Sequence, residues 1–318
     1  MLRRLQLFLI VVMLFGIAPA ARAQDGNVMY AVAEIEQRLR NHPFEIQDRQ
    51  GSRFEGDRTQ RVTLMFPDSV MMMVKWAKAA PGGESFNNVP RYEIAAYELQ
   101  KLFLDEKDYV VPPTVARIVS LPWYQGLDRT VRPTFSSTSS VLVVLQYWLW
   151  NVTGTDFYDQ NRLRADSVYA RHLADMNILT YLIRHSDANH GNYLISKDSA
   201  NPRLFSVDNG VAFRSEESNR GTEWRDLRVD RLPRATVERL RGIQRQELEA
   251  ALGVLEQFEI RDGELIPIEK SANFAAGRGI RRKDNQLQLG LTTREIAEVH
   301  ARLQRLIRQV DSGRIATF

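Results

Sequence analysis

The 318-residue chain contains no cysteine, and this absence removes several kinds of chemistry at once. A protein without thiols has no disulfides, no cysteine nucleophile and no thiolate ligand for a metal ion. An excess of one charge is also lacking, since 43 Lys and Arg residues accompany 39 Asp and Glu residues. No internal repeat is visible. The hydrophobic content of 44% is ordinary for a globular protein, so stability must come from a packed core.

Only the first 23 residues have the pattern of a targeting segment. A positively charged start precedes an apolar run over 5–17, and Ala21-Arg22-Ala23 is a small-x-small cleavage site. We therefore expect the signal peptide 1–23 to be removed, the mature chain to begin at Gln24, and the protein to be periplasmic or secreted. The alternative is an uncleaved N-terminal anchor.

Removal of this segment takes away three arginines and no acid, so the formal net charge falls from +4 to +1. Nucleic acid is therefore not an expected partner, because a basic surface would be needed to bind it. No other segment of the chain is long and apolar enough to be expected to cross a membrane.

The most informative motif lies in the second half of the chain. The sequence reads His185-Ser-Asp-Ala-Asn-His-Gly-Asn192 and then Val207-Asp-Asn-Gly210. Kinases need one carboxylate to deprotonate an attacking hydroxyl, and an amide and a second carboxylate to bind magnesium on the nucleotide phosphates. The spacing predicts Asp187 as the catalytic base and Asn192 and Asp208 as metal ligands.

Each of these residues also has an ordinary structural explanation. An aspartate at a helix end, an asparagine beside a glycine and an Asp-Asn-Gly turn are common in loops. Their shared helix–loop–hairpin context favours the kinase interpretation over three coincidences. His190 is predicted to contact phosphate or to have a structural role, because the histidines at 172, 185 and 190, without cysteine, match no zinc spacing.

A kinase also needs a lysine from the third strand, which contacts the α- and β-phosphates and pairs with a carboxylate from the next helix. Lys75 ends an apolar strand, and Glu93 lies early in the following helix. Their rivals are Lys78 and Glu98. The apolar residues that flank Lys75 and Glu93 favour this pair, because they predict burial between two layers.

Two glycines, Gly51 and Gly56, flank the first strand connection. They are predicted to form the turn that covers the phosphates of ATP, although a plain hairpin would use the same residues. Trp148 and Trp150 follow a buried strand and either line the adenine pocket or pack in the core. The basic cluster Arg278, Arg281, Arg282 and Lys283 is either a site for an acidic ligand or a solvated loop.

Hydrophobic periodicity predicts an α+β fold with two lobes. Helices are expected over 30–40, 90–103 and 162–184, and from the capping box at 292–295 to about Val310. Strands are expected over 44–49, 61–66, 70–75, 141–149, 193–195 and 204–207, and residues 110–114 are expected to start a new extended segment. From Thr236 onward the chain is expected to be mainly helical. The order is that of a protein kinase-like fold, with an N-lobe over 24–145 and a C-lobe over 146–318 that carries a helical C-terminal extension.

Two segments resemble known kinase families. Residues 90–99, which contain Glu93-Ile-Ala-Ala96, and the Val-Pro-Pro segment at 111–113 are similar to the secretory-pathway kinases of the Golgi casein kinase type. In that family the glutamate of the Glu-Ile-Ala-Ala helix pairs with the strand lysine, which implies the same role for Glu93. The loop at 187–192 and the segment 207–213 resemble phosphoinositide 3/4-kinases and bacterial HipA-type kinases. The resemblance covers roughly residues 45 to 215.

The chain departs from the usual protein kinase pattern in three places. Ser186 stands where most protein kinases have arginine, the metal motif is Asp-Asn-Gly instead of Asp-Phe-Gly, and no Ala-Pro-Glu motif follows. These differences leave phosphoryl transfer intact but put a conventional activation segment and peptide groove in doubt.

The sequence therefore predicts an exported atypical kinase that uses ATP with Mg²⁺ or Mn²⁺. Its acceptor would be a hydroxyl of a protein, a lipid or a sugar. Two alternatives remain open: a non-catalytic kinase fold that binds a nucleotide or a partner, and an enzyme that transfers AMP with the nucleotide reversed.

Overall fold

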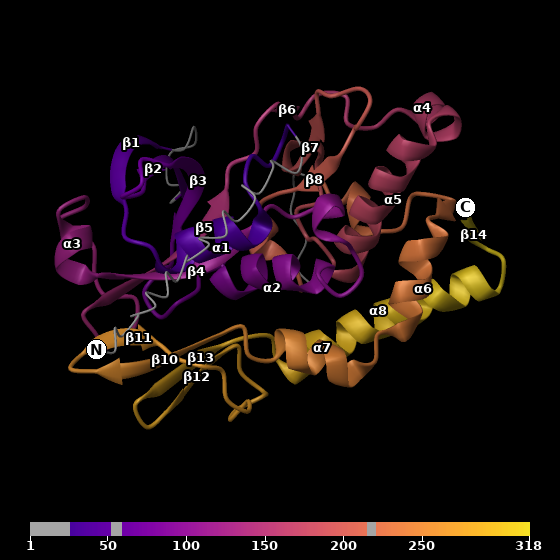
Figure 1. Cartoon of the computed structure of the whole chain (residues 1–318). Helices are drawn as coiled ribbons and strands as arrows, with labels where there is room; N and C mark the ends of the chain where they lie inside the picture. The colour runs from indigo at the N-terminus through magenta and orange to yellow at the C-terminus, as the bar shows by residue number, and fades with distance from the viewer. Residues whose placement is uncertain (1–25, 52–58, 215–220) are drawn as a thin grey trace, which may run out of the picture.

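The computed structural model describes residues 26–51, 59–214 and 221–318 (Figure 1). The predicted signal peptide 1–23 and Gly56 lie outside the described residues. Within the described ranges, no helix combines the length and the apolar composition that a bilayer crossing would require.

The N-terminal half is built on a five-stranded antiparallel sheet with the order β1-β2-β3-β5-β4. Its strands are β1 (Glu45–Gly51), β2 (Thr59–Met65), β3 (Met71–Lys78), β4 (Thr114–Ser120) and β5 (Ser140–Tyr147). Side chains alternate between two faces along β3. Val74 and Trp76 are fully buried on one face of the sheet. Lys75 points to the other face, which borders the candidate site.

Helices cover this sheet on both sides. The helices α1 (Val32–Asn41) and α3 (Leu121–Gln125) pack on the face of Val74 and Trp76. The helix α2 (Pro90–Gln100) packs on the face of Lys75 and begins with proline at its first position, where the fixed φ favours a helix start. Ten of its eleven residues are buried, so α2 is fixed by contacts all around. It ends at Gln100, three residues before the expected end.

The next part of the chain contains the motif loop. It contains the helices α4 (Gln160–Ala165) and α5 (Ser167–Leu182), a three-stranded sheet of β6 (Val152–Thr153), β7 (Tyr193–Ser196) and β8 (Leu204–Ser206), and the short helical turn η4 (Glu223–Arg225). A further turn, η1 (Glu106–Asp108), lies earlier in the chain, between α2 and β4. The single helix expected over 162–184 is interrupted at Asp166. Its carboxylate accepts the N–H groups of Val168 and Tyr169 and thereby caps a new helix.

The C-terminal third was expected to be mainly helical, and this expectation missed a sheet. The helices are α6 (Arg234–Gly242), α7 (Arg245–Leu252) and α8 (Thr293–Asp311). Between them lies a four-stranded sheet of β10 (Glu256–Arg261), β11 (Glu264–Pro267), β12 (Ile280–Lys283) and β13 (Gln286–Leu289). A parallel pair, β9 (Arg231–Leu232) and β14 (Ala316–Thr317), closes the chain end. Asp262 and Gly263 both have positive φ in the first hairpin, and this Asp-Gly pair was the overlooked turn signal.

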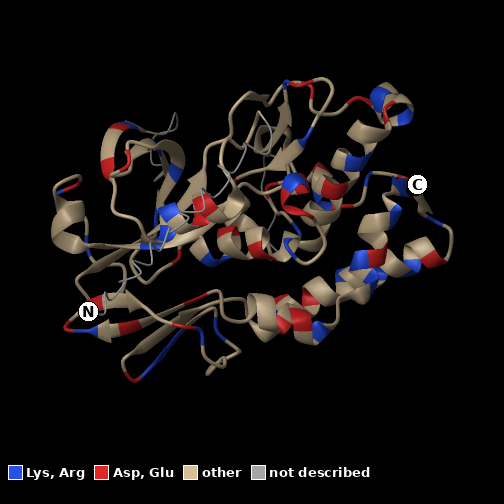
Figure 2. Cartoon of the chain, in the orientation of Figure 1, with Lys and Arg blue, Asp and Glu red and all other residues tan. Residues whose placement is uncertain are grey.

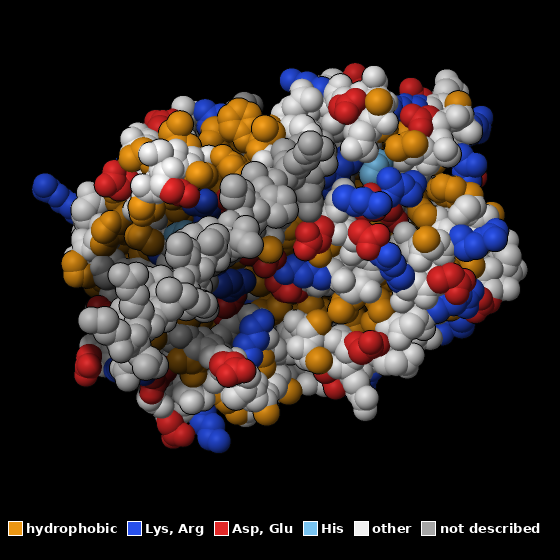
Figure 3. Space-filling model, viewed as in Figure 1, with side chains coloured by type: hydrophobic (Ala, Val, Ile, Leu, Met, Phe, Trp, Pro, Cys, Tyr) orange, Lys and Arg blue, Asp and Glu red, His pale blue; other side chains and the backbone are white. Residues whose placement is uncertain are grey.

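This C-terminal sheet lies beneath β4, and α7 and α8 continue from it below α2 (Figure 1). Lys and Arg are interspersed with Asp and Glu along α6, α7 and α8 (Figure 2). The face seen in Figure 3 likewise mixes both charge signs with hydrophobic side chains.

Candidate active site

Lys75 lies between two carboxylates that come from different parts of the chain. Its Nζ atom is 2.7 Å from Oε1 of Glu93 on α2 and 2.5 Å from Oδ1 of Asp208, which follows β8. Burial by itself would lower the pKa of the Lys75 ammonium, but the charges of Asp208 and Glu93 outweigh it and raise the pKa. Lys75 therefore keeps its positive charge on the face of the N-terminal sheet that borders the candidate site.

Asp208 is positioned by an unusual backbone conformation. Its φ of 60° and ψ of 45° lie in the left-handed region, which aspartate tolerates better than most residues. The short turn η3 (Asn209–Val211) follows, and the Asn209 N–H donates to Oε2 of Glu93 at 3.2 Å. One carboxylate oxygen of Glu93 thus accepts a hydrogen bond from the Lys75 ammonium, and the other accepts one from the backbone N–H of Asn209, next to Asp208. The side chain of Asp208 stays 58% exposed, whereas that of Glu93 is 8% exposed.

Asp187 and Asn192 form a second cluster across the turn η2 (His190–Asn192). The Asn192 amide nitrogen donates to the backbone oxygen of Asp187 at 2.7 Å and to its Oδ2 at 3.0 Å. The Asn189 amide donates to Oδ1 of Asp187 at 2.8 Å. Two donors therefore orient the Asp187 carboxylate, which is partly exposed and so accessible to a substrate hydroxyl.

His185 connects the loop of Asp187 to the strand that leads to Asp208. Its Nδ1 atom accepts the N–H of Asp187 at 3.2 Å, so Nε2 carries the proton and donates to the Val207 carbonyl at 3.4 Å. Burial lowers the pKa of this imidazole and favours its neutral form. The Val207 N–H in turn donates to the Asn192 carbonyl at 3.0 Å. Sequence analysis weighed His185 only as a zinc ligand and rejected that role, although kinases have a histidine two residues before the aspartate of their catalytic loop.

The rivals of the predicted pair lie elsewhere. Lys78 forms an ion pair with Asp128 at 3.0 Å, and Glu98 pairs with Lys101 at 2.9 Å. Among the described residues, neither Lys78 nor Glu98 forms an ion pair with Glu93 or Lys75. The choice between the candidates is therefore made by geometry.

The other predicted residues have different surroundings. Gly51 ends β1 opposite Gln60, and a Cβ added to Gly51 would meet nothing within 4 Å. His190 is exposed, and its ring packs edge-on against Phe157 at 5.0 Å. No contact in the described residues brings His190 to Lys75 or Asp208, so its role in phosphate binding stays a prediction, as does that of Gly51.

The basic cluster is divided by the fold. Arg281 is 1% exposed in β12 and donates to the carbonyls of Gly253, Ala275, Arg278 and Leu291. It is a structural residue, and the expectation of a four-residue basic loop is wrong. Arg278, Arg282 and Lys283 remain exposed.

The two tryptophans are partly exposed. Trp148 is 38% exposed with the Arg61 guanidinium 5.6 Å from its ring, and Trp150 is 46% exposed. Core packing alone does not account for either ring.

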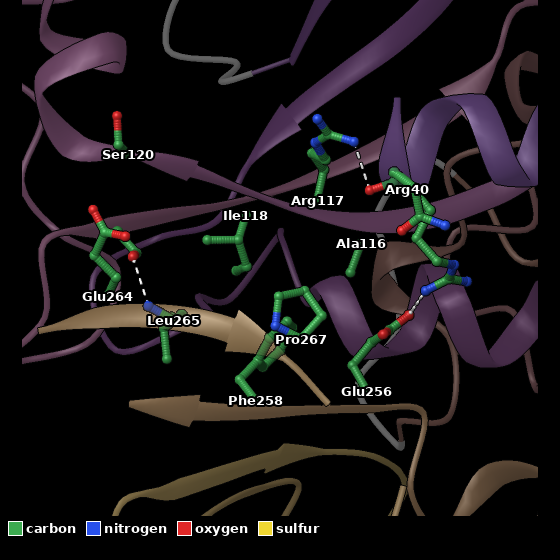
Figure 4. Close-up of a pocket in the computed structure, with 12 residues that line it drawn as sticks. Arg40, Ala116, Arg117, Ile118, Ser120, Glu256, Phe258, Glu264, Leu265 and Pro267 are labelled. Carbon is green, nitrogen blue, oxygen red and sulfur yellow. Dashed lines mark hydrogen bonds and ion pairs between the residues drawn. The ribbon is translucent and has the colours of Figure 1, made fainter. Parts of the chain in front are cut away.

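A cavity of about 330 Å³ lies away from all of these residues, between the N-terminal and C-terminal sheets (Figure 4). Its lining includes Arg117 and Ile118 of β4 and Phe258 of β10, and an ion pair between Arg40 and Glu256 lies at one end. None of the predicted site residues lines it.

The residues of the site fit a divalent cation. The carboxylate of Asp208 is accessible, and oxygen ligands suit Mg²⁺. Because the Asn192 amide nitrogen donates to Asp187, its amide oxygen is turned away from Asp187, and no donor among the described residues meets that oxygen. Asn192 and Asp208 therefore have the chemistry of a metal-binding pair.

Comparison with known proteins finds likeness in structure but not in sequence. No family model and no curated protein matches the chain. A Golgi casein kinase structure superimposes with a TM-score of 0.50 and 13% identity, covering 89% of this chain and 78% of the other. A Golgi casein kinase with Mn and ADP bound and a hydra Fam20 with sugar each give a TM-score of 0.49 at 13% identity, with 77% and 88% of those chains covered.

The likeness at a TM-score of 0.50 shows the fold. The chain has the α+β, two-lobed fold of an atypical kinase, and the resemblance to the Golgi casein kinase type is confirmed at that level. The resemblance of the motif loop to phosphoinositide 3/4-kinases and HipA-type kinases stays a prediction.

Proposed function

We propose that the chain is an atypical kinase, a phosphotransferase that uses ATP and Mg²⁺ or Mn²⁺ and acts on a hydroxyl acceptor outside the cytoplasm. One observation carries the proposal: the Lys75 ammonium contacts both Glu93 and Asp208, although Asp208 is 133 residues from Lys75 in the sequence. A strand lysine, a helix glutamate and an aspartate after a hairpin are the parts that a kinase uses to bind the phosphates of ATP.

Each residue then has a distinct role. Lys75 supplies positive charge to the α- and β-phosphates, and Glu93 keeps it in position. Asn192 and Asp208 would hold the metal ion, which supplies charge neutralisation for the transferred phosphoryl group. Asp187 orients the acceptor hydroxyl, with its two oxygens fixed by Asn189 and Asn192. The acceptor would be positioned for attack at the γ-phosphorus.

In the reaction, the acceptor oxygen forms a bond to the γ-phosphorus and the bond between that phosphorus and the β–γ bridging oxygen breaks. ADP leaves, and the hydroxyl proton passes to Asp187. A protein serine or threonine is the acceptor to test first, since the structure with the higher TM-score is named a casein kinase. Lipid and sugar acceptors would be tested next.

The test uses the chain Gln24–Phe318 with γ-labelled ATP and either metal ion, beside Asp187→Ala and Asp208→Ala. Label transferred to the protein itself or to a generic protein acceptor, and lost in both variants, supports the proposal. Label that appears only from α-labelled ATP would replace it by AMP transfer. Nucleotide binding without transfer to any protein, lipid or sugar acceptor would contradict it in favour of a binding protein.

A further inference from the structure

The C-terminal third contacts the helix that carries Glu93. The helix α2 packs against α7, and its first turn meets the start of α8 and the strand ends of the C-terminal sheet. Residues 91 and 93 are about 200° apart around a helix, so their side chains point to opposite sides. Glu93 faces Lys75, whereas Arg91 faces the C-terminal third.

The Glu295 carboxylate of α8 accepts hydrogen bonds from two side chains of α2, those of Arg91 and Tyr92. Its Oε2 atom is 2.7 Å from Nη1 of Arg91, and its Oε1 accepts the Tyr92 hydroxyl at 2.5 Å. Arg91 also donates to the Tyr92 hydroxyl at 3.1 Å and forms an ion pair with Glu84 at 3.0 Å. These contacts make one closed network across the junction of α2 and α8.

The network is buried, and its charges are compensated. The side chains of Arg91 and Glu295 are 8% and 12% exposed. Burial would raise the pKa of Glu295, but hydrogen bonds and the charge of Arg91 outweigh it and lower the pKa. Buried ion pairs are costly to break, because the remaining partner loses its compensation.

Two glycines shape the space that Arg91 occupies. A Cβ on Gly279 would collide with the guanidinium of Arg91, and a Cβ on Gly290 would collide with the Gly253 carbonyl. The Gly290 N–H donates to the Gly279 carbonyl at 3.0 Å, so the two glycines lie side by side. The Gly290 carbonyl lies 3.5 Å from Nη1 of Arg91. The end of the C-terminal sheet is therefore shaped closely around the arginine.

The same network reaches the segment that follows the metal motif. The Tyr92 ring lies 5.4 Å from the Phe213 ring, and the Arg214 guanidinium lies 5.6 Å from the Tyr92 ring. Phe213 comes five residues after Asp208. Glu295 thus touches, through Tyr92, both the helix of Glu93 and the chain that carries Asp208.

We propose that Glu295 is a positioning residue: through Arg91 and Tyr92 it fixes α2 in the place where Glu93 pairs with Lys75. The C-terminal third then stabilises the position of Lys75, the phosphate-binding lysine, without touching the substrate itself. The expected effect on catalysis rests on the proposed kinase function, whereas the effect on α2 and Lys75 does not.

The variant Glu295→Gln tests this without disrupting α8. Glu295 also closes the capping box of α8, where its carboxylate accepts the Thr292 N–H at 2.7 Å, and glutamine serves in a capping box as well. Two controls separate the effects. Thr292→Ala weakens the cap and keeps the charge, and Glu298→Gln changes a carboxylate of α8 that pairs with Arg294 and Arg302 of the same helix.

The measurements are hydrogen exchange of the α2 amides and the rate at which an amine-reactive reagent acylates Lys75 in the full chain. We expect Glu295→Gln to increase the rate of hydrogen exchange and the rate of acylation by about tenfold. The reason is that positions of α2 in which Glu93 does not pair with Lys75 become more populated. The two controls should leave Lys75 acylation unchanged. Equal rates in Glu295→Gln and the native chain, or equal acceleration in Thr292→Ala, would overturn the proposal.

Kinetics provide a second readout. Glu295→Gln should lower kcat more than it raises the KM for ATP, because the nucleotide still finds Lys75 but the lysine is misplaced during transfer. A native chain that transfers no phosphate would refute the proposed function alone, since hydrogen exchange and acylation still decide the role of Glu295.

Discussion

Two partly buried cations of the N-terminal half pair with carboxylates from other elements of the fold, and they differ in what surrounds them. Lys75 contacts Asp208, whose side chain is 58% exposed, and Glu93, which is 8% exposed. Arg40 of α1 contacts Glu256 of β10, whose side chain is 9% exposed. The first pair includes a carboxylate open to a ligand, while the second closes one end of a cavity (Figure 4).

The difference also appears in the balance of burial and charge. At Lys75, two carboxylates outweigh burial and raise the pKa of the ammonium. At Glu256, burial outweighs Arg40, so the pKa of the carboxyl stays above its usual range. A site for a metal-bound nucleotide needs the first arrangement, because the lysine keeps its positive charge for the phosphates and the accessible carboxylate can ligate the metal ion. The second arrangement is typical of a contact that joins two parts of a fold.

The largest effect is expected at the accessible carboxylate. Asp208→Ala should reduce phosphoryl transfer by at least about 100-fold, because electrostatic stabilisation of the transferred group is lost. The thermal midpoint should change little, since Lys75 keeps Glu93. Transfer to a protein acceptor and thermal unfolding measure the two quantities, and unchanged activity would contradict the assignment of Asp208.

A smaller loss of activity is expected when the lysine keeps its place in the sequence but loses its helix partner. Glu93→Gln should lower kcat by about 10- to 100-fold, because one charge that orients Lys75 is removed. Glu98→Gln, on the same helix, is the matched control and should retain activity, since Glu98 pairs with Lys101. Equal losses in the two variants would show that α2 is disturbed in general.

The second ion pair is expected to affect stability and not activity. Arg40→Ala should lower the free energy of unfolding by about 2 kcal/mol, less than for a fully buried pair because Arg40 is 31% exposed. The loss should be greater at pH 8 than at pH 5, since a protonated Glu256 does not need the arginine. Denaturant unfolding at both values checks this, and a loss that does not depend on pH would argue against the unpaired carboxylate as its cause.

Asp175 of α5 extends the comparison to a buried carboxyl whose hydrogen-bond partner is a hydroxyl. Burial raises its pKa to about 7, and the Thr236 hydroxyl donates to it at 2.8 Å. The folded state then binds a proton that the unfolded state has released, so its stability falls as pH rises from about 4 to about 7.

Asp175→Asn keeps an acceptor for Thr236 and removes this titration. It should stabilise the chain by on the order of 1 kcal/mol at pH 8 and change little at pH 4. Unfolding at the two pH values measures the difference. A variant that loses stability equally at both would instead indicate that asparagine does not fit the site.

Much of the architecture was predictable because its signals are local. Strand-like runs on either side of the turn at 67–69 predicted the strands that became β2 and β3, and the capping box at 292–295 predicted the start of α8. The interruption at Asp166 was missed, because a capping aspartate inside an otherwise helical pattern is a weak signal. The C-terminal sheet was missed although Asp262-Gly263 is a hairpin signal, since its strands have only four to six residues.

The site divides in the same way. Asp187 and Asn192 could be predicted as site residues from their spacing within one loop. The network of Arg91, Tyr92 and Glu295 could not be found, because Glu295 is about 200 residues from the other two and each residue looks like an ordinary helix residue. His185 had a local signal, its place two residues before Asp187, but it was weighed only as a zinc ligand, and that role was rejected.

The sequence by itself determined the strands, the main helices, and the presence in one loop of the aspartate and asparagine on which the kinase interpretation depends. Only the tertiary structure decided that Lys75 and not Lys78 meets Glu93, and that Asp208 joins them. The physical reason is the distance along the chain over which each kind of signal acts. Periodicity, caps and turns depend on neighbours within a few residues, whereas an ion pair depends on where separate layers place their side chains.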